Sequence, residues 1–202
     1  MPNDTDPRNQ LNDEFGYAVY AIWVYASEHQ IDQIARLRRT MLANRQVLPA
    51  YVAAGAHVTL KSLFRDITDL ARLKVITQEI ANTNRPFFLH LDQTAIEWGD
   101  GDHTSAIPVV PDKSLISLNG RLESAIGPLS GQRFGGSEYT PHMTVYQDAT
   151  ESEVIRGREL VRKLNLRDGF EVISLELVGR VGPFATGHWE SLGKYPLIGD
   201  SD

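Results

Sequence analysis

One four-residue pattern occurs twice in the chain, as His57-Val58-Thr59-Leu60 and again as His142-Met143-Thr144-Val145. Each copy consists of histidine, an apolar residue, threonine and a second apolar residue, and the two histidines lie 85 residues apart. Successive side chains of a strand point to opposite faces, so each copy places its polar pair on one face and its apolar pair in the core. The fold therefore has to accommodate two matching strands, each half polar and half buried.

The order of predicted elements also repeats around the two copies. Each half of the chain is expected to run strand, helix, strand, helix, strand, because apolar β-branched runs alternate with apolar residues at helical spacing. The predicted strands are residues 17–25, 56–60, 87–98, 106–110, 140–146, 170–178 and 189–197. The predicted helices are residues 27–44, 66–82, 114–126 and 151–164. Pro108 and Pro111 predict that the strand at 106–110 is short or lies at a sheet edge.

This repetition indicates two similar lobes packed into one α+β body. Residues 1–14 are polar and acidic and are expected to form a frayed tail. Residues 15–202 are then one domain, with lobes of roughly 15–100 and 101–202 and a last strand that can cross between them. If a pseudo-twofold axis relates the lobes, the two polar strand faces meet across a central cleft. The alternative is chance alternation, which is frequent in mixed α/β proteins.

Composition narrows the classes of function. The 202 residues are 42% hydrophobic and 23% charged, which is typical of a soluble globular protein. The chain has no cysteine, which excludes disulfides, thiolate metal sites and a cysteine nucleophile, and a cytoplasmic location is expected. No apolar run approaches the ~20 residues of a membrane span. The formal charge of −6 disfavours wrapping of DNA or long RNA, so the expected partner of a monomeric chain is a small nucleotide or an RNA end.

The repeated residue types suit phosphodiester chemistry. One neutral histidine of the pair His57 and His142 can take a proton from the attacking hydroxyl or water, and the other can give one to the leaving oxygen. The hydroxyls of Thr59 and Thr144 can donate to the non-bridging phosphate oxygens. No cofactor and no metal is required. Two other interpretations are open: ordinary strand histidines bonded to backbone, or a zinc or iron site, for which no carboxylate lies at a short spacing from either histidine.

Residues near the two copies are further candidates for substrate contacts. Lys61, beyond the first copy, and Arg133, in the glycine-rich loop at 131–136, can hold phosphate oxygens. Phe64, Tyr139 and Tyr146 can stack on a nucleobase. Each has an alternative, because surface cations are commonly solvated and aromatic residues beside strands are more often core. Tyr17, Tyr20 and Trp23 alternate poorly and are expected mostly to pack.

The segments Ala56–Leu60 and Tyr139–Val145, the latter with Pro141 before its histidine, resemble the two motifs of the 2H phosphoesterase superfamily. The branch of bacterial 2′-5′ RNA ligases and RNA 2′,3′-cyclic phosphodiesterases is the most similar. This resemblance implies a bilobal fold with two mainly antiparallel sheets around a cleft. It also implies that His57 is the acid for the leaving oxygen and His142 the base. Lys61 and Tyr146, which follow the motifs, have no assured match among the residues that RNA-ligating members place there, which leaves the substrate more open than the chemistry.

The resulting expectation is a metal-independent phosphoesterase that hydrolyses a 2′,3′-cyclic phosphate or a 2′-5′ phosphodiester on a nucleotide or RNA end. Two alternatives stay open. Ligation of RNA ends through a 2′-5′ bond uses the same atoms in reverse. A binding module would grip a phosphorylated ligand without turnover, but it would have less need of two proton carriers.

Overall fold

The structure of the chain is a computed structural model. It describes residues 15–46, 50–65, 67–92, 96–98, 104–129, 132–133, 139–147, 149–161, 163–164, 169–182 and 187–199. The helices are α1 (Glu28–Met41), α2 (Ala50–Ala53), α3 (Leu70–Asn82), α4 (Lys113–Ile126), α5 (Glu151–Val161) and a 3-10 turn, Gly127–Leu129. The strands are β1 (Val19–Tyr25), β2 (His57–Arg65), β3 (Phe87–Leu91), β4 (Ile96–Trp98), β5 (Thr104–Val110), β6 (Gln132–Arg133), β7 (His142–Tyr146), β8 (Gly169–Val172), β9 (Ser174–Val181) and β10 (His188–Pro196).

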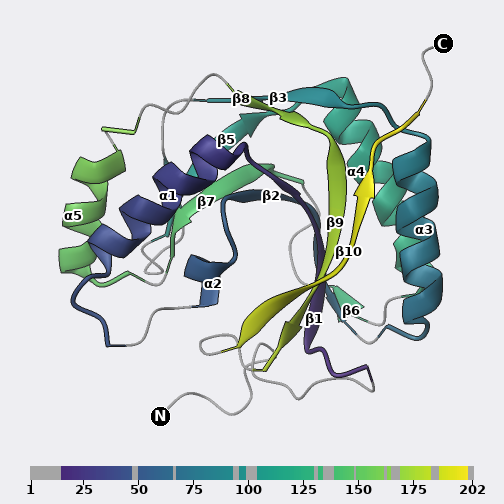
Figure 1. The fold of residues 1–202 in the computed structure, drawn as a ribbon, viewed down its shortest axis with the longest axis horizontal. Coiled ribbons are helices and arrows are strands. Elements are labelled where there is room, and N and C mark those ends of the chain that lie inside the picture. Colours follow the sequence, from purple (N-terminus) through teal and green to yellow (C-terminus); the bar gives the residue numbers. More distant parts are fainter. Residues whose placement is uncertain are drawn as a thin grey trace.

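The predicted α+β class is confirmed, and every described strand pairing is antiparallel. Eight strands follow one another in the order β10-β9-β1-β2-β7-β5-β3-β8, while β4 pairs with β5 and β6 pairs with β2. The prediction of a single strand at 170–178 was wrong, because this segment is interrupted at Ile173 and forms β8 and β9. These two strands follow each other in the chain but lie near opposite ends of the strand order, so the sheet curls strongly (Figure 1).

Strands from the first half of the chain pair with strands from the second half. β1 and β2 of the first half pair with each other, as β5 and β7 of the second half do. The third strand of each half then pairs with the other half, since β3 pairs with β5 and β9 pairs with β1. The repeated order of elements therefore produces two interlocked groups of strands. The domain limits expected from the sequence stay a prediction, because residues 1–14 lie outside the described residues.

β5 has seven residues and lies between β7 and β3, so the short or edge strand expected from its prolines was wrong. Pro108 is opposite His142 of β7, and the next amide, Val109, donates to Pro141 O at 3.0 Å. The nitrogen of Pro108 faces the other side of β5, where β4 pairs only as far as Ala106 and β3 pairs only from Val109 onward. Proline is accepted at this position because the ladder needs no amide donor there.

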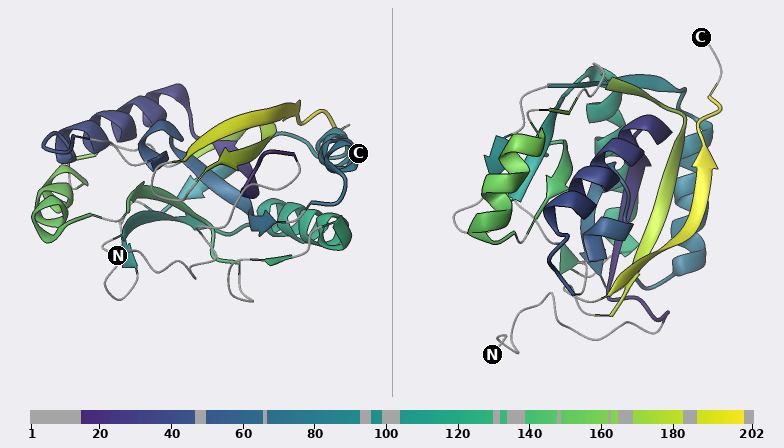
Figure 2. Two further views of the ribbon diagram at one scale, coloured as in Figure 1. Left: turned by 90° about the horizontal axis from the view of Figure 1, so that it is seen from below. Right: turned by 60° about the vertical axis from the view of Figure 1, so that its left-hand side comes forward.

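Figures 1 and 2 show α1 and α5 on one side of the molecule and α3 and α4 on the opposite side. Local sequence explains why α1 starts where it does. Ser27 and Gln30 form a capping box, in which each side chain bonds the other residue's backbone. Among the described residues, no helix is long and apolar enough to cross a membrane.

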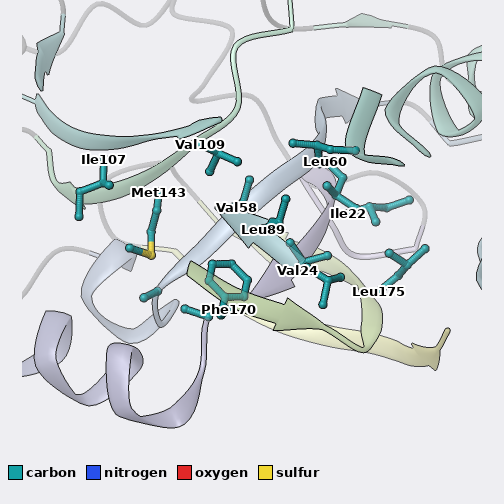
Figure 3. Close-up of a cluster of buried hydrophobic side chains, with 14 of the residues drawn as sticks. Ile22, Val24, Val58, Leu60, Leu89, Ile107, Val109, Met143, Phe170 and Leu175 are labelled. Carbon is teal, nitrogen blue, oxygen red and sulfur yellow. The ribbon is translucent and has the colours of Figure 1, made fainter. Parts of the chain in front are cut away.

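The main core lies between the sheet and these helices. Figure 3 shows Val58 and Leu60 of β2 and Met143 of β7 within this buried cluster. Val58, Leu60, Met143 and Val145 are all 0% exposed. The apolar residues of both repeated motifs are therefore core residues, as predicted.

Candidate functional site

The two histidine-containing motifs lie side by side. β2 and β7 pair antiparallel, with Val58 opposite Met143. In this register His57 is opposite Thr144, and Thr59 is opposite His142. Because Val58 and Met143 point into the core, all four polar residues share the other face of the sheet. The motifs are thus brought together by direct strand pairing rather than from opposite walls of a cleft.

Both histidines hold the same backbone contact. His57 Nδ1 lies 3.3 Å from Gly55 O, and His142 Nδ1 lies 3.0 Å from Thr140 O. A carbonyl oxygen only accepts, so Nδ1 carries the proton in each neutral ring and the lone pair is on Nε2. Diagonal neighbours on paired strands lie about 7 Å apart, which lets the two rings reach opposite sides of one phosphorus atom.

Trp23 of β1 supports His57 from the neighbouring strand. The indole and imidazole rings are stacked, with centroids 3.7 Å apart and an interplanar angle of 13°. The ring of Trp189 of β10 packs against the same indole, with the two ring centroids 4.6 Å apart. The expectation that Trp23 mostly packs agrees with its 2% exposure, but no pattern in the chain indicated that its partner is a motif histidine.

The environment of the site favours neutral imidazoles in the free protein. Burial lowers the pKa of His57 to about 3, and the nearby charges of Arg38 and His142 act in the same direction. Burial also lowers the pKa of His142. An anionic phosphodiester bound between the rings would oppose both effects and raise both pKa values.

Acid should destabilise the protein through His57. The unfolded chain binds this proton at its ordinary pKa of 6.5, whereas the folded protein binds it only near 3, so the free energy of unfolding falls as the pH falls between these values. The contribution between pH 7 and pH 5 is on the order of 2 kcal/mol. Urea unfolding at both pH values should show a smaller loss for His57→Gln than for wild type. Equal losses in both proteins would contradict the prediction.

Tyr139 also reaches the motifs. Its hydroxyl donates to Thr59 O at 3.2 Å, which joins the segment before β7 to the first part of β2. Burial raises its pKa above the ordinary range. This contact anchors the second motif against the first.

Lys61 and Tyr146 do not join the polar group. Lys61 is 1% exposed and forms an ion pair with Glu123 of α4, a helix whose leucines pack in the core with Leu60. A bulge explains this direction, since β1 advances one residue from Ile22 while β2 advances two from Lys61. Tyr146 is 1% exposed and packs within the main core.

Phe64 and Arg133 are opposite each other where β2 pairs with β6. Their side chains lie outside the described residues, as does most of the loop at 131–136. Their expected substrate contacts therefore stay predictions. Within the described part of the chain, no three histidine, aspartate or glutamate side chains are grouped so as to hold a metal ion.

The fold is similar to several solved structures. Escherichia coli LigT in complex with 3′-AMP has a TM-score of 0.58 at 17% identity, covering 88% of this chain and 97% of LigT. TT0787 of Thermus thermophilus has a TM-score of 0.61 at 16% identity, covering 91% of this chain and 100% of its own. A structure described as a phosphoesterase has a TM-score of 0.60 at 17% identity, covering 89% and 98%. At these identities the likeness establishes the fold.

A comparison with curated protein sequences found no match. The family model described as the 2′-5′ RNA ligase superfamily matches residues 25–183, which includes both histidine motifs and most of the sheet. This match agrees with the resemblance carried by the two motifs. The chain belongs to the 2′-5′ RNA ligase superfamily, within the 2H phosphoesterases.

Proposed function

We propose that the protein is a metal-independent phosphoesterase that hydrolyses a 2′,3′-cyclic phosphate or a 2′-5′ phosphodiester on a nucleotide or RNA end. The observation that carries the proposal is the register of β2 and β7, which places two histidines and two threonines on one face. Membership of a superfamily of phosphoesterases and ligases supports it. So does the binding of nucleotides by a protein of the same fold, since LigT has been solved with 3′-AMP and with ATP.

In the proposed reaction water attacks the phosphorus atom of the cyclic phosphate. His142 Nε2 takes the proton of the water as the new P–O bond forms. The bond from phosphorus to the 3′ oxygen breaks, and His57, which takes up a second proton on Nε2 from solvent when the anionic substrate binds, gives that proton to this oxygen. The product is a 2′-phosphate with a free 3′ hydroxyl, and the histidines exchange protons with solvent to restore the starting state.

The proposed role of the two threonines is to stabilise negative charge on the phosphate, whereas the histidines transfer protons. Thr59 and Thr144 flank the space between the imidazoles, each opposite the histidine of the other motif. Their hydroxyls donate to the non-bridging oxygens, whose negative charge has to be stabilised as water adds. The symmetry of the arrangement also permits the reverse reaction, so ligation through a 2′-5′ bond is the second candidate, favoured by the family's name.

One set of assays tests the proposal. The protein is incubated with 2′,3′-cyclic nucleotides, 2′-5′ dinucleotides and RNA ending in a cyclic phosphate, with and without a chelator. We expect a terminal phosphomonoester at equal rates in both conditions. A longer RNA product would instead indicate ligation, loss of turnover with chelator would exclude the metal-free mechanism, and nucleotide binding without turnover would support a binding module.

A further inference from the structure

Arg38 is a buried cation that faces the backbone of both motifs. It lies in α1 and is 1% exposed. Every hydrogen bond that its guanidinium donates to the described residues goes to a main-chain oxygen. Burying a guanidinium is costly unless its donors are satisfied, so this position is demanding for the fold.

The carbonyls bound by Arg38 belong to the two segments that carry the catalytic candidates. Nε donates to Val145 O at 2.9 Å and Nη2 donates to Thr144 O at 2.8 Å, both in the second motif. Nη1 donates to Gly55 O at 3.1 Å and to Tyr51 O at 3.0 Å. Gly55 O is the oxygen that also holds His57 Nδ1, so the guanidinium and the imidazole share one acceptor.

We propose that Arg38 is a positioning residue of the phosphoesterase site. Its guanidinium binds two carbonyls at once, the Gly55 carbonyl that orients His57 and the main-chain carbonyl of Thr144. This inference rests on the proposed function and deepens it. A planar guanidinium has five donors in a fixed fork, so it sets the relative position of carbonyls on separate segments. With Gly55 O fixed, His57 keeps its proton on Nδ1 and directs Nε2 at the substrate. With Thr144 O fixed, the threonine stays opposite His57.

The variant Arg38→Lys tests the planar geometry of the guanidinium separately from its positive charge. An ammonium keeps the cation but lacks the planar geometry that reaches four carbonyls. A displacement of reacting groups by about 1 Å can cost ~10²-fold in rate. We expect Arg38→Lys to lower kcat on a 2′,3′-cyclic nucleotide by roughly 10- to 100-fold with KM within about 3-fold, because the clamp acts on geometry rather than on affinity.

Gln30→Met is the matched control. Gln30 lies in the same helix, is also 1% exposed, and donates to Gly169 O of β8 at 3.2 Å, a carbonyl outside both motifs. We expect this variant to lower the melting temperature without changing kcat. If Arg38→Lys does not fold at the assay temperature, Arg38→Gln, whose neutral amide keeps two donors, takes its place and should also lower kcat.

The ring nitrogens of His57 give a readout independent of turnover. In ¹⁵N spectra of the free protein we expect a single Nδ1–H tautomer for wild type and Gln30→Met, and a mixture for Arg38→Lys. Unchanged kcat or an unchanged tautomer in a folded Arg38→Lys protein would overturn the inference. Absence of turnover in wild type would overturn the proposed function instead, and the tautomer would still decide whether Arg38 orients His57.

Discussion

Replacing either motif histidine by alanine should lower kcat/KM on a 2′,3′-cyclic nucleotide by on the order of 10²–10⁴. Each substitution removes one of the two proton transfers that accompany displacement at phosphorus. In both His57 and His142, a hydrogen bond from Nδ1 to a backbone carbonyl fixes the orientation of the ring. Alanine therefore removes an imidazole that is already oriented for proton transfer. Steady-state rates, with circular dichroism to verify folding, provide the measurement.

A change of leaving group separates the acid from the base. A p-nitrophenyl phosphodiester releases p-nitrophenolate, a stable anion that needs no proton, so loss of the acid should matter little for this substrate. We expect His57→Ala to retain most of its activity on this substrate and His142→Ala to lose it. The opposite result would reverse the roles assigned here.

His90→Ala serves as the matched control for these variants. His90 lies on β3 and is exposed, and it should be replaceable without effect on turnover. A wild-type rate for either His57→Ala or His142→Ala would contradict the two-histidine mechanism.

Replacing Thr59 or Thr144 by valine should lower kcat by about 10²–10³. Valine keeps the branched shape that suits a strand and removes only the hydroxyl that donates to the phosphate oxygens. Most of the loss should appear in kcat, since the charge on these oxygens changes as water adds. Thr59→Ser and Thr144→Ser keep the donor and should retain most of the activity.

The control here is Thr77→Val in α3. Thr77 is 0% exposed and donates to Leu73 O within its own helix, away from the motifs. It should affect stability alone. Valine variants at Thr59 and Thr144 that turn over as fast as wild type would show that the hydroxyls do not stabilise the transition state.

The local sequence pattern predicted the positions of helices and strands better than it predicted which strands pair with each other. The spacing of apolar residues in α1 is a property of neighbouring residues, so the helix was predicted nearly to its ends. Alternation likewise predicted that Val58 and Met143 are buried. It identifies the face of a strand but not the strand beside it, so the direct pairing of β2 with β7 had no sequence signal.

The residues that sequence reasoning missed or misplaced depend on contacts between distant segments. Arg38 lies on a helix rich in charged residues, and its burial depends on carbonyls more than 100 residues away. Lys61 was expected to contact the substrate because it follows the first motif. The bulge that turns it toward Glu123 is a feature of the pairing of β1 with β2, and alternation alone predicts the opposite face.

The exchange of third strands between the two halves has a consequence for chain assembly. A polypeptide ending after β4 would lack the strand that β9 adds beside β1 and would leave β3 without β5. Such a fragment would also leave β2 without β7 and β3 without β8, so every strand of the first half would have an unpaired edge. The first half of the chain therefore cannot complete its strand pairing, or bring the two histidines together, until the second half has been synthesised.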